Sequence, residues 1–289
     1  MFSIGLSTCG TPVTPDMLTA IREGGATHIE LSYGKAAYDG MDVAATAAMI
    51  RAHGLVMHSL HLPFSRELDI SLADPALREA TMTCQKELMK RGAAAGIPLF
   101  VIHPSSEPIA DEDRPARMAQ SKESLAVLAE LAVSLGVTLA VEDLPRTCLG
   151  NCSAEMKELL SAHEALRSCF DTNHLLGEDA VAYVRAVGDK IVTTHVSDYD
   201  FLNERHWLPG EGKQDFIGIL SALREVGYRG PWLYELGLTA PKSIVRPREL
   251  IYADFGENAR ALFAGKCPAP VGTPVEGLGM WAEKSPIPQ

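Results

Sequence analysis

The stretch DPALREATMTCQKELMKRGAAAGIPLFVIH, residues 74–103, contains a helix-like segment followed by a strand-like segment. In residues 74–96 apolar side chains recur every three or four positions, which is typical of an amphipathic helix that ends at a glycine. Residues 97–103 form a short, nearly continuous apolar run, as a buried parallel strand does. The stretch therefore predicts one helix–strand unit of an α/β protein.

The same unit repeats along the chain. Strand-sized apolar runs begin near residues 3, 28, 56, 98, 138, 167, 191 and 232. Segments with helical spacing lie between them, for example residues 14–25, 117–136 and 216–227. Alternating strands and helices build a parallel sheet, and eight units in about 250 residues suit a closed barrel better than an open sheet. No GxGxxG motif follows the first run, which also disfavours a dinucleotide-binding fold. We predict a single (β/α)8 TIM barrel over residues 1–264.

Residues 265–289 are rich in proline and glycine, which predicts an irregular C-terminal tail. We expect this tail to wrap over the barrel or to reach a neighbouring subunit, with Trp281 as its anchor. A homodimer or a homotetramer is compatible with this expectation.

Composition narrows the class of protein. The chain has 289 residues, of which 46% are hydrophobic and 22% charged, as in ordinary soluble proteins. The net charge of -11 disfavours nucleic acid as a partner, because such affinity comes mainly from clustered Lys and Arg. We find no signal peptide and no apolar window long enough to span a membrane. The six cysteines are scattered and predict free thiols, so we expect a cytoplasmic protein that acts on small molecules.

Ionisable side chains lie in or just after seven of the eight strand-like runs. They are Glu30, His58, His61, His103, Glu142, Asp171, His195 and Glu235. In a TIM barrel the active site lies at the carboxyl ends of the strands, where most of these residues would meet. Taken singly, an Asp in this place is most often a helix N-cap and a His a hydrogen-bonded core residue. Both interpretations stay open for Asp171 and His174 in FDTNHLLGED, residues 170–179.

Ionisable residues recur at seven strand ends, and this recurrence favours a metal site over a helix cap or a core histidine at each position. Burying so many ionisable groups is costly unless a cation compensates them. We predict that Glu142, Asp171, His195 and Glu235 bind one divalent metal ion. Carboxylate and imidazole ligands without cysteine suit Mn, Co, Zn or Mg. Such a set leaves room for two substrate oxygens, as in the open site of an enzyme.

Seven segments carry a resemblance to a known family. They are SLHLPF (59–64), VIHPSS (101–106), AVEDLP (140–145), FDTNH (170–174), THVSDYD (194–200), RHWLPGEGKQDF (205–216) and YEL (234–236). With these segments the chain resembles the xylose isomerase-like barrels over about residues 2–263. Within that superfamily it is similar to the sugar phosphate isomerase/epimerase group, which includes ketose 3-epimerases, and more distantly to the apurinic endonuclease branch. The segment HWLPGEG followed by Asp215 is the most specific of these matches.

The resemblance implies roles for particular residues. It implies the same four metal ligands, with Glu142 and Glu235 also acting as the acid/base pair. It implies that His174 and Arg205 contact substrate oxygens. We group His61, His103 and His206 with these substrate-binding residues. The same three histidines match positions that bind additional metals in the endonuclease branch, so the number of metal ions stays open.

The activity implied by the resemblance is metal-dependent isomerisation or epimerisation of a sugar or sugar phosphate. A glutamate would remove a proton next to the ketose carbonyl, and a metal-stabilised enediolate would accept it back on the other face. Three alternatives stay open: a dehydratase of a cyclic polyol ketone, a multi-zinc phosphodiesterase of the apurinic endonuclease type, and a barrel that binds a ligand without turnover. The acidic charge disfavours the phosphodiesterase, and the paired glutamates disfavour simple binding. Whether the substrate is phosphorylated also stays open.

Overall fold

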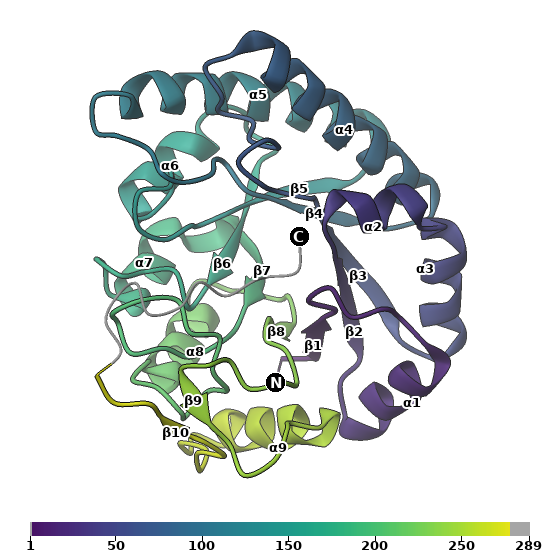
Figure 1. Ribbon diagram of the computed structural model, residues 1–289, viewed down its shortest axis with the longest axis vertical. Coiled ribbons are helices and arrows are strands. Elements are labelled where there is room, and N and C mark those ends of the chain that lie inside the picture. Colours follow the sequence, from purple (N-terminus) through teal and green to yellow (C-terminus); the bar gives the residue numbers. More distant parts are fainter. Residues whose placement is uncertain (1, 278–289) are drawn as a thin grey trace.

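Eight parallel strands stand side by side in a ring in the computed structural model, which describes residues 2–277 (Figure 1). The strands are β1 (Ile4–Ser7), β2 (His28–Ser32), β3 (Val56–His61), β4 (Leu99–Ile102), β5 (Thr138–Glu142), β6 (Arg167–Asp171), β7 (Ile191–His195) and β8 (Trp232–Tyr234). Consecutive strands pair from β1 to β7, and β8 pairs with β1. A bridge between Val196 and Tyr234 closes the ring between β7 and β8. The predicted TIM barrel is confirmed.

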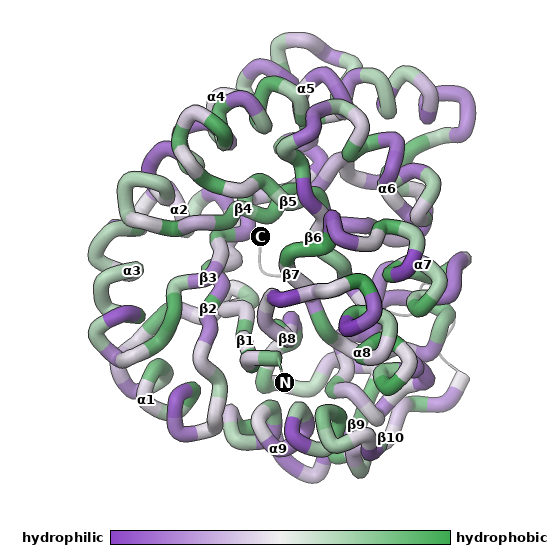
Figure 2. Tube along the Cα trace, turned by 180° about the vertical axis from the view of Figure 1, so that it is seen from behind, coloured by the Kyte–Doolittle hydropathy of each residue, from purple (hydrophilic) through white to green (hydrophobic). Residues whose placement is uncertain are grey.

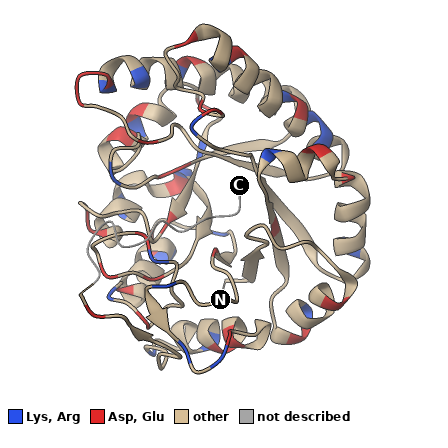
Figure 3. Ribbon diagram, in the orientation of Figure 1, with Lys and Arg blue, Asp and Glu red and all other residues tan. Residues whose placement is uncertain are grey.

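Helices surround the barrel and connect its strands (Figure 1). They are α1 (Pro15–Gly24), α2 (Lys35–Gly40), α3 (Val43–Ala52), α4 (Pro75–Ala94), α5 (Arg114–Leu135), α6 (Ser153–Leu160), α7 (Ala180–Val187), α8 (Phe216–Glu225) and α9 (Tyr252–Phe263), with a 3-10 turn at Gly188–Lys190. Hydrophilic and hydrophobic colours alternate along these helices, as amphipathic helices require (Figure 2). Most charged residues belong to this outer layer of helices and to the loops (Figure 3).

The unit at residues 74–103 folds as the sequence predicts. The Asp74 side chain accepts hydrogen bonds from the backbone N–H groups of Ala76 and Leu77, and Pro75 occupies the first helical position of α4. This cap satisfies N–H groups that have no partner inside the helix. Strand β4 follows, and its four residues are all buried.

The last helix begins later than its sequence pattern suggests. From the sequence we expect the last helix to run roughly from Pro247 to Ala264, whereas α9 begins at Tyr252. The Asp254 side chain accepts the backbone N–H of Ile251 and pairs with Arg248, which fixes the start of the helix at this point. Helix α9 then packs against α1, where a Cβ on Gly256 would lie only 1.9 Å from the carbonyl oxygen of Gly24. Only glycine allows so close an approach.

The described part of the predicted tail, residues 265–277, contains one short strand. Strand β10 (Thr273–Pro274) pairs with β9 (Ile244–Val245) in a two-stranded antiparallel sheet outside the barrel. The expected anchor, Trp281, lies outside the described residues. Among the described residues, no helix combines the length and apolar character that a membrane crossing needs.

Candidate metal and active site

Four predicted metal ligands meet at the carboxyl ends of neighbouring strands. Glu142, Asp171 and His195 are the last residues of β5, β6 and β7, and Glu235 directly follows β8. One ligand atom from each lies within 4.8 Å of the others. The first three side chains are buried, and the side chain of Glu235 is 16% exposed. The barrel therefore brings together residues that are up to 93 positions apart in the sequence (235 minus 142).

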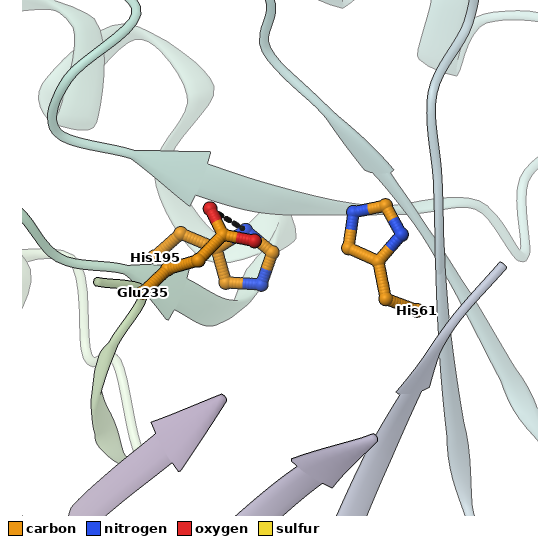
Figure 4. Close-up of side chains that lie close together, drawn as sticks. All are labelled: His61, His195 and Glu235. Carbon is orange, nitrogen blue, oxygen red and sulfur yellow. Dashed lines mark ion pairs between the residues drawn. The ribbon is translucent and has the colours of Figure 1, made fainter. Parts of the chain in front are cut away.

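The imidazole of His195 lies between two of the carboxylates. Its Nδ1 atom is 3.0 Å from Oε1 of Glu142 and 3.3 Å from Oε2 of Glu235. Figure 4 shows His195 beside Glu235, with His61 facing them from the opposite side. The same nitrogen thus points at the centre of the carboxylate cluster.

Asp171 uses its two oxygens differently. Oδ1 accepts the backbone N–H of Asn173 at 2.6 Å, so this residue does cap the turn after β6. Oδ2 is buried and has no hydrogen-bond partner in the described part of the chain. Nδ1 of His174 lies 3.4 Å from it as an ion-pair neighbour. A buried carboxylate oxygen that accepts no hydrogen bond is costly, and a cation at the cluster would satisfy it. The donor set therefore fits a divalent metal ion, which would supply Lewis-acid chemistry at this position.

The carboxyl groups of the cluster have unequal pKa values. Burial opposes ionisation of Glu142, but the imidazoles of His195 and His103 outweigh it and hold the pKa of this carboxyl well below its usual range. Burial, with the nearby charges of Glu142 and Asp171, raises the pKa of Glu235 to about 8. Burial and Glu142 also raise the pKa of Asp171. Two carboxyl groups whose environments push their pKa values apart are typical of an acid/base pair.

Two further histidines bind the other oxygen of Glu142. Nε2 of His61 lies 2.8 Å from Glu142 Oε2, and Nε2 of His103 lies 3.2 Å from it. The ring of Phe64 stacks on His103, with centroids 3.8 Å apart. His61, His103 and Glu142 also have ligand atoms within 4.8 Å of one another. These residues form a second group that could hold a metal ion, and it shares Glu142 with the first.

Both ring nitrogens of His174 are occupied. Nδ1 donates to the backbone carbonyl of Asp143 at 2.7 Å, and Nε2 lies 2.9 Å from Oε1 of Glu204. Burial opposes a charge on this ring, but Asp171 and Glu204 outweigh it and raise the pKa of His174 well above its ordinary value. Glu204 is a residue that the sequence analysis missed. Its loop position follows no strand or helix pattern, and its place beside Arg205 and His206 is the one available signal.

Arg146 forms hydrogen bonds and ion pairs that connect three loops around the site. Its guanidinium binds both carboxylate oxygens of Glu107, the amide oxygen of Asn203 and Oε2 of Glu204, at 2.6–3.0 Å. These partners come from the loops after β4 and β7, whereas Arg146 follows β5. The residue adopts a left-handed φ of 53°, which is uncommon for an arginine. Its positive charge is therefore already balanced by two carboxylates.

Arg205 and His206 stand next to each other in the loop after β7. The buried guanidinium of Arg205 pairs with Asp200, with Nε and Nη2 each 2.9 Å from Oδ2. The backbone N–H of Arg205 donates to the side chain of Asn173 beside the β6 turn. Nδ1 of His206 lies 3.3 Å from the backbone carbonyl of Glu235. The structure thus places both residues beside the cluster, and neither belongs to its four-residue group.

The HWLPGEG segment is held in place by Asp198. The carboxylate accepts four backbone N–H groups, from Tyr199, Gly210, Gly212 and Gln214. A Cβ on Gly212 would lie 2.3 Å from Oδ1 of Asp198, so this position requires glycine. These contacts explain why the segment is so specific a sequence motif.

Comparison with known proteins places the chain in a family. The family model for xylose isomerase-like TIM barrels matches residues 18–253. The chain belongs to the xylose isomerase-like TIM barrel family. The resemblance inferred from the sequence motifs is confirmed.

Relatives of this xylose isomerase-like barrel include sugar 3-epimerases. It is 26% identical to an L-ribulose 3-epimerase of Methylomonas sp. over 209 residues, which cover 68% of this chain and 69% of the relative. It is also 26% identical to an uncharacterised protein of Methanocaldococcus jannaschii over 180 residues, and this match spans 59% of the chain and 61% of that protein. A solved D-tagatose 3-epimerase-like structure shares the fold, with a TM-score of 0.76, 19% identity, and coverage of 91% of this chain and 96% of the other.

Proposed function

We propose that this protein is a divalent-metal-dependent sugar epimerase or isomerase. One observation carries the proposal: Glu142 and Glu235, from strands on different sides of the cluster, lie within one group with Asp171 and His195. A site that only binds a ligand has no need of two carboxyl groups with opposite pKa shifts. The similarity to sugar 3-epimerases supports the same reaction class.

In this proposal the two glutamates exchange protons with the substrate. The ionised carboxylate of Glu142 removes a proton from one face of a carbon next to the carbonyl, and the protonated Glu235 delivers one on the other face. Mn, Co, Zn or Mg bound at the four ligands would polarise the carbonyl. His174 and Arg205 contact substrate oxygens, and His61, His103 and His206 line the remaining rim. Delivery of a proton to the opposite face of the same carbon gives an epimer, and delivery to the neighbouring carbon gives an isomer.

The charges at the rim favour an unphosphorylated sugar. A phosphate group binds well where a guanidinium is available to it. Arg146 is paired with Glu107 and Glu204, and Arg205 is paired with Asp200. A phosphate would have to displace these carboxylates.

A second candidate is a multi-metal phosphodiesterase. The additional group of His61, His103 and Glu142 favours it, because two adjacent metal ions assist in-line displacement at phosphorus. Metal content separates the candidates. One tightly bound ion per chain supports the sugar enzyme, and two or three zinc ions support the phosphodiesterase. A dehydratase of a cyclic polyol ketone shares the first proton transfer and differs in its product.

Solvent deuterium exchange tests the main proposal. The metal-loaded protein is incubated in D2O with a panel of free ketoses, and incorporation at carbon is followed by NMR. We expect deuterium next to the carbonyl of at least one ketose, with its loss in Glu142→Gln and Glu235→Gln. Glu225→Gln, which changes an exposed carboxylate on α8, is the matched control and should exchange normally. Absence of exchange with every ketose, while metal is bound, would refute proton transfer.

A further inference from the structure

Glu30 is a fully buried acid that the four-residue cluster does not include. It lies in β2, and its exposed fraction is 0%. An ionised carboxylate inside a barrel is strongly disfavoured unless donors or a positive charge compensate it. Its position therefore requires specific partners.

Glu30 has two such partners, one for each oxygen. Oε2 accepts the hydroxyl hydrogen of Ser59 at 2.8 Å. Oε1 lies 3.0 Å from Nε2 of His195. Neither Oε1 nor this nitrogen has a hydrogen-bond partner elsewhere in the described residues. The two atoms therefore face each other as an ion pair inside the barrel.

The strand register supports this arrangement. Ile29 of β2 pairs with Met57 of β3, and a regular ladder would then set Glu30 opposite His58. The register shifts by one residue here, so that Glu30 is opposite Ser59 instead. Bulges next to active sites commonly redirect a side chain. This one gives Glu30 the hydroxyl donor that holds its second oxygen.

The contact sets the orientation of His195. Its two nitrogens lie on different sides of the ring, and Nδ1 points at Glu142 and Glu235 while Nε2 points at Glu30. A histidine that binds a metal through one nitrogen commonly donates its other N–H to a carboxylate, which fixes the ring and its tautomer. The contacts that run from Ser59 through Glu30 to His195 therefore lead to the centre of the carboxylate cluster.

We propose that Glu30 is a positioning residue for the metal site, which acts by fixing the His195 ring so that Nδ1 faces the ion. The inference rests on the metal-binding part of the proposed function. It assigns to Glu30 no contact with substrate.

Metal affinity, measured without substrate, tests this role. We compare the wild type with Glu30→Leu, which removes the contact, and Glu30→Gln, which keeps an acceptor for the Nε2–H of His195. Affinity for Mn(II) is measured by chelator competition, and the ligand geometry by the visible spectrum of the Co(II) form. Loss of such a partner typically weakens metal binding by about 10- to 100-fold. We expect this loss in Glu30→Leu, a smaller loss in Glu30→Gln, and an altered Co(II) spectrum in Glu30→Leu.

Ser168→Ala is the matched control, because Ser168 is a buried polar residue of β6 whose hydroxyl donates to the backbone carbonyl of Cys169. It should bind both metals as the wild type does. Wild-type affinity and an unchanged Co(II) spectrum in a folded Glu30→Leu protein would overturn the inference. If Glu30→Leu does not fold, the same result in Glu30→Met, which also lacks an acceptor for the Nε2–H of His195, would overturn it. A metal-binding wild type without deuterium exchange contradicts only the proposed reaction, whereas a wild type that binds no metal contradicts both.

Discussion

Glu204 Oε1 lies 2.9 Å from His174 Nε2, on the ring whose Nδ1 donates to a backbone carbonyl. A carbonyl only accepts hydrogen bonds, and so does an ionised carboxylate. His174 therefore carries protons on both nitrogens while this arrangement holds. A substrate oxygen that reaches Nε2 must share or replace the carboxylate of Glu204.

This pairing predicts that Glu204 and His174 act as a unit. We expect Glu204→Ala and His174→Ala each to lower kcat/KM by about tenfold or more, with little further loss in the double variant, because residues in contact couple by 0.5–3 kcal/mol. Glu204→Gln, which still accepts a hydrogen bond, should lose less. The measurement is a double-mutant cycle on the ketose that shows exchange. Additive losses in the cycle would show that the two side chains act independently.

The substitution Asp171→Asn distinguishes the turn-capping role of this residue from its metal-binding role. The amide oxygen of Asn can still accept the N–H of Asn173, so we expect little change in the unfolding midpoint of the metal-free protein. The charge that faces the cluster is lost, and we expect metal affinity to fall by at least about tenfold, since carboxylates are the stronger ligands of these ions. Calorimetric titration measures the metal affinity, and denaturant unfolding measures the stability of the metal-free protein. Full metal affinity and activity in this variant would leave Asp171 with a capping role alone.

His58 predicts how stability depends on pH. Burial lowers the pKa of this histidine to about 4 in the folded chain, against 6.5 for an ordinary imidazole. Between these values the unfolded chain binds a proton that the folded chain does not, so the free energy of unfolding decreases as pH falls from 6.5 to 4. The loss is at most about 3–4 kcal/mol, and above pH 6.5 this residue contributes no pH dependence. Denaturant unfolding of the metal-free protein at several pH values should show a flatter profile for His58→Gln. Identical profiles for the two proteins would contradict the assignment.

Arg246 and Glu211 form an ion pair inside the protein. Their side chains are 1% and 0% exposed, and Glu211 also accepts the backbone N–H groups of Leu208 and Gly272. Removing one member of a buried pair leaves the other charge uncompensated, so Arg246→Ala should cost about 3–5 kcal/mol of stability. The denaturant midpoint measures this cost. Arg185→Ala, which breaks an exposed pair with Glu225, is the control and should leave the midpoint unchanged. Equal effects of the two substitutions would argue against the buried pair.

The barrel could be predicted from the sequence because its signals are local and repeated. Each strand is a short apolar run, each helix carries its own spacing, and the carboxyl-end rule of the fold then places Glu142, Asp171 and His195 together. The start of α9 could not be predicted this way, because Asp254 and Arg248 fix it by side-chain contacts that apolar spacing does not contain.

The partners of the site residues were harder to predict. Glu30 is visible in the sequence as an acid inside an apolar run, but its contact with His195 depends on a register shift that only the folded sheet shows. Glu204 reaches His174 through the path of a loop, which has no periodicity to read. The question whether Asp171 caps a turn or points into the site has a mixed answer, because its two oxygens differ in surroundings.

The four hydrogen bonds to Asp198 have a practical consequence for protein engineering. They hold both ends of the segment from Tyr199 to Gln214, while Phe201 and Leu202 within it stay exposed. Substitutions at Leu202 therefore leave these four hydrogen bonds in place, whereas Phe201 has a left-handed φ of 65° that favours glycine. A library at Leu202 would vary the exposed surface of this segment without changing the residues proposed to transfer protons.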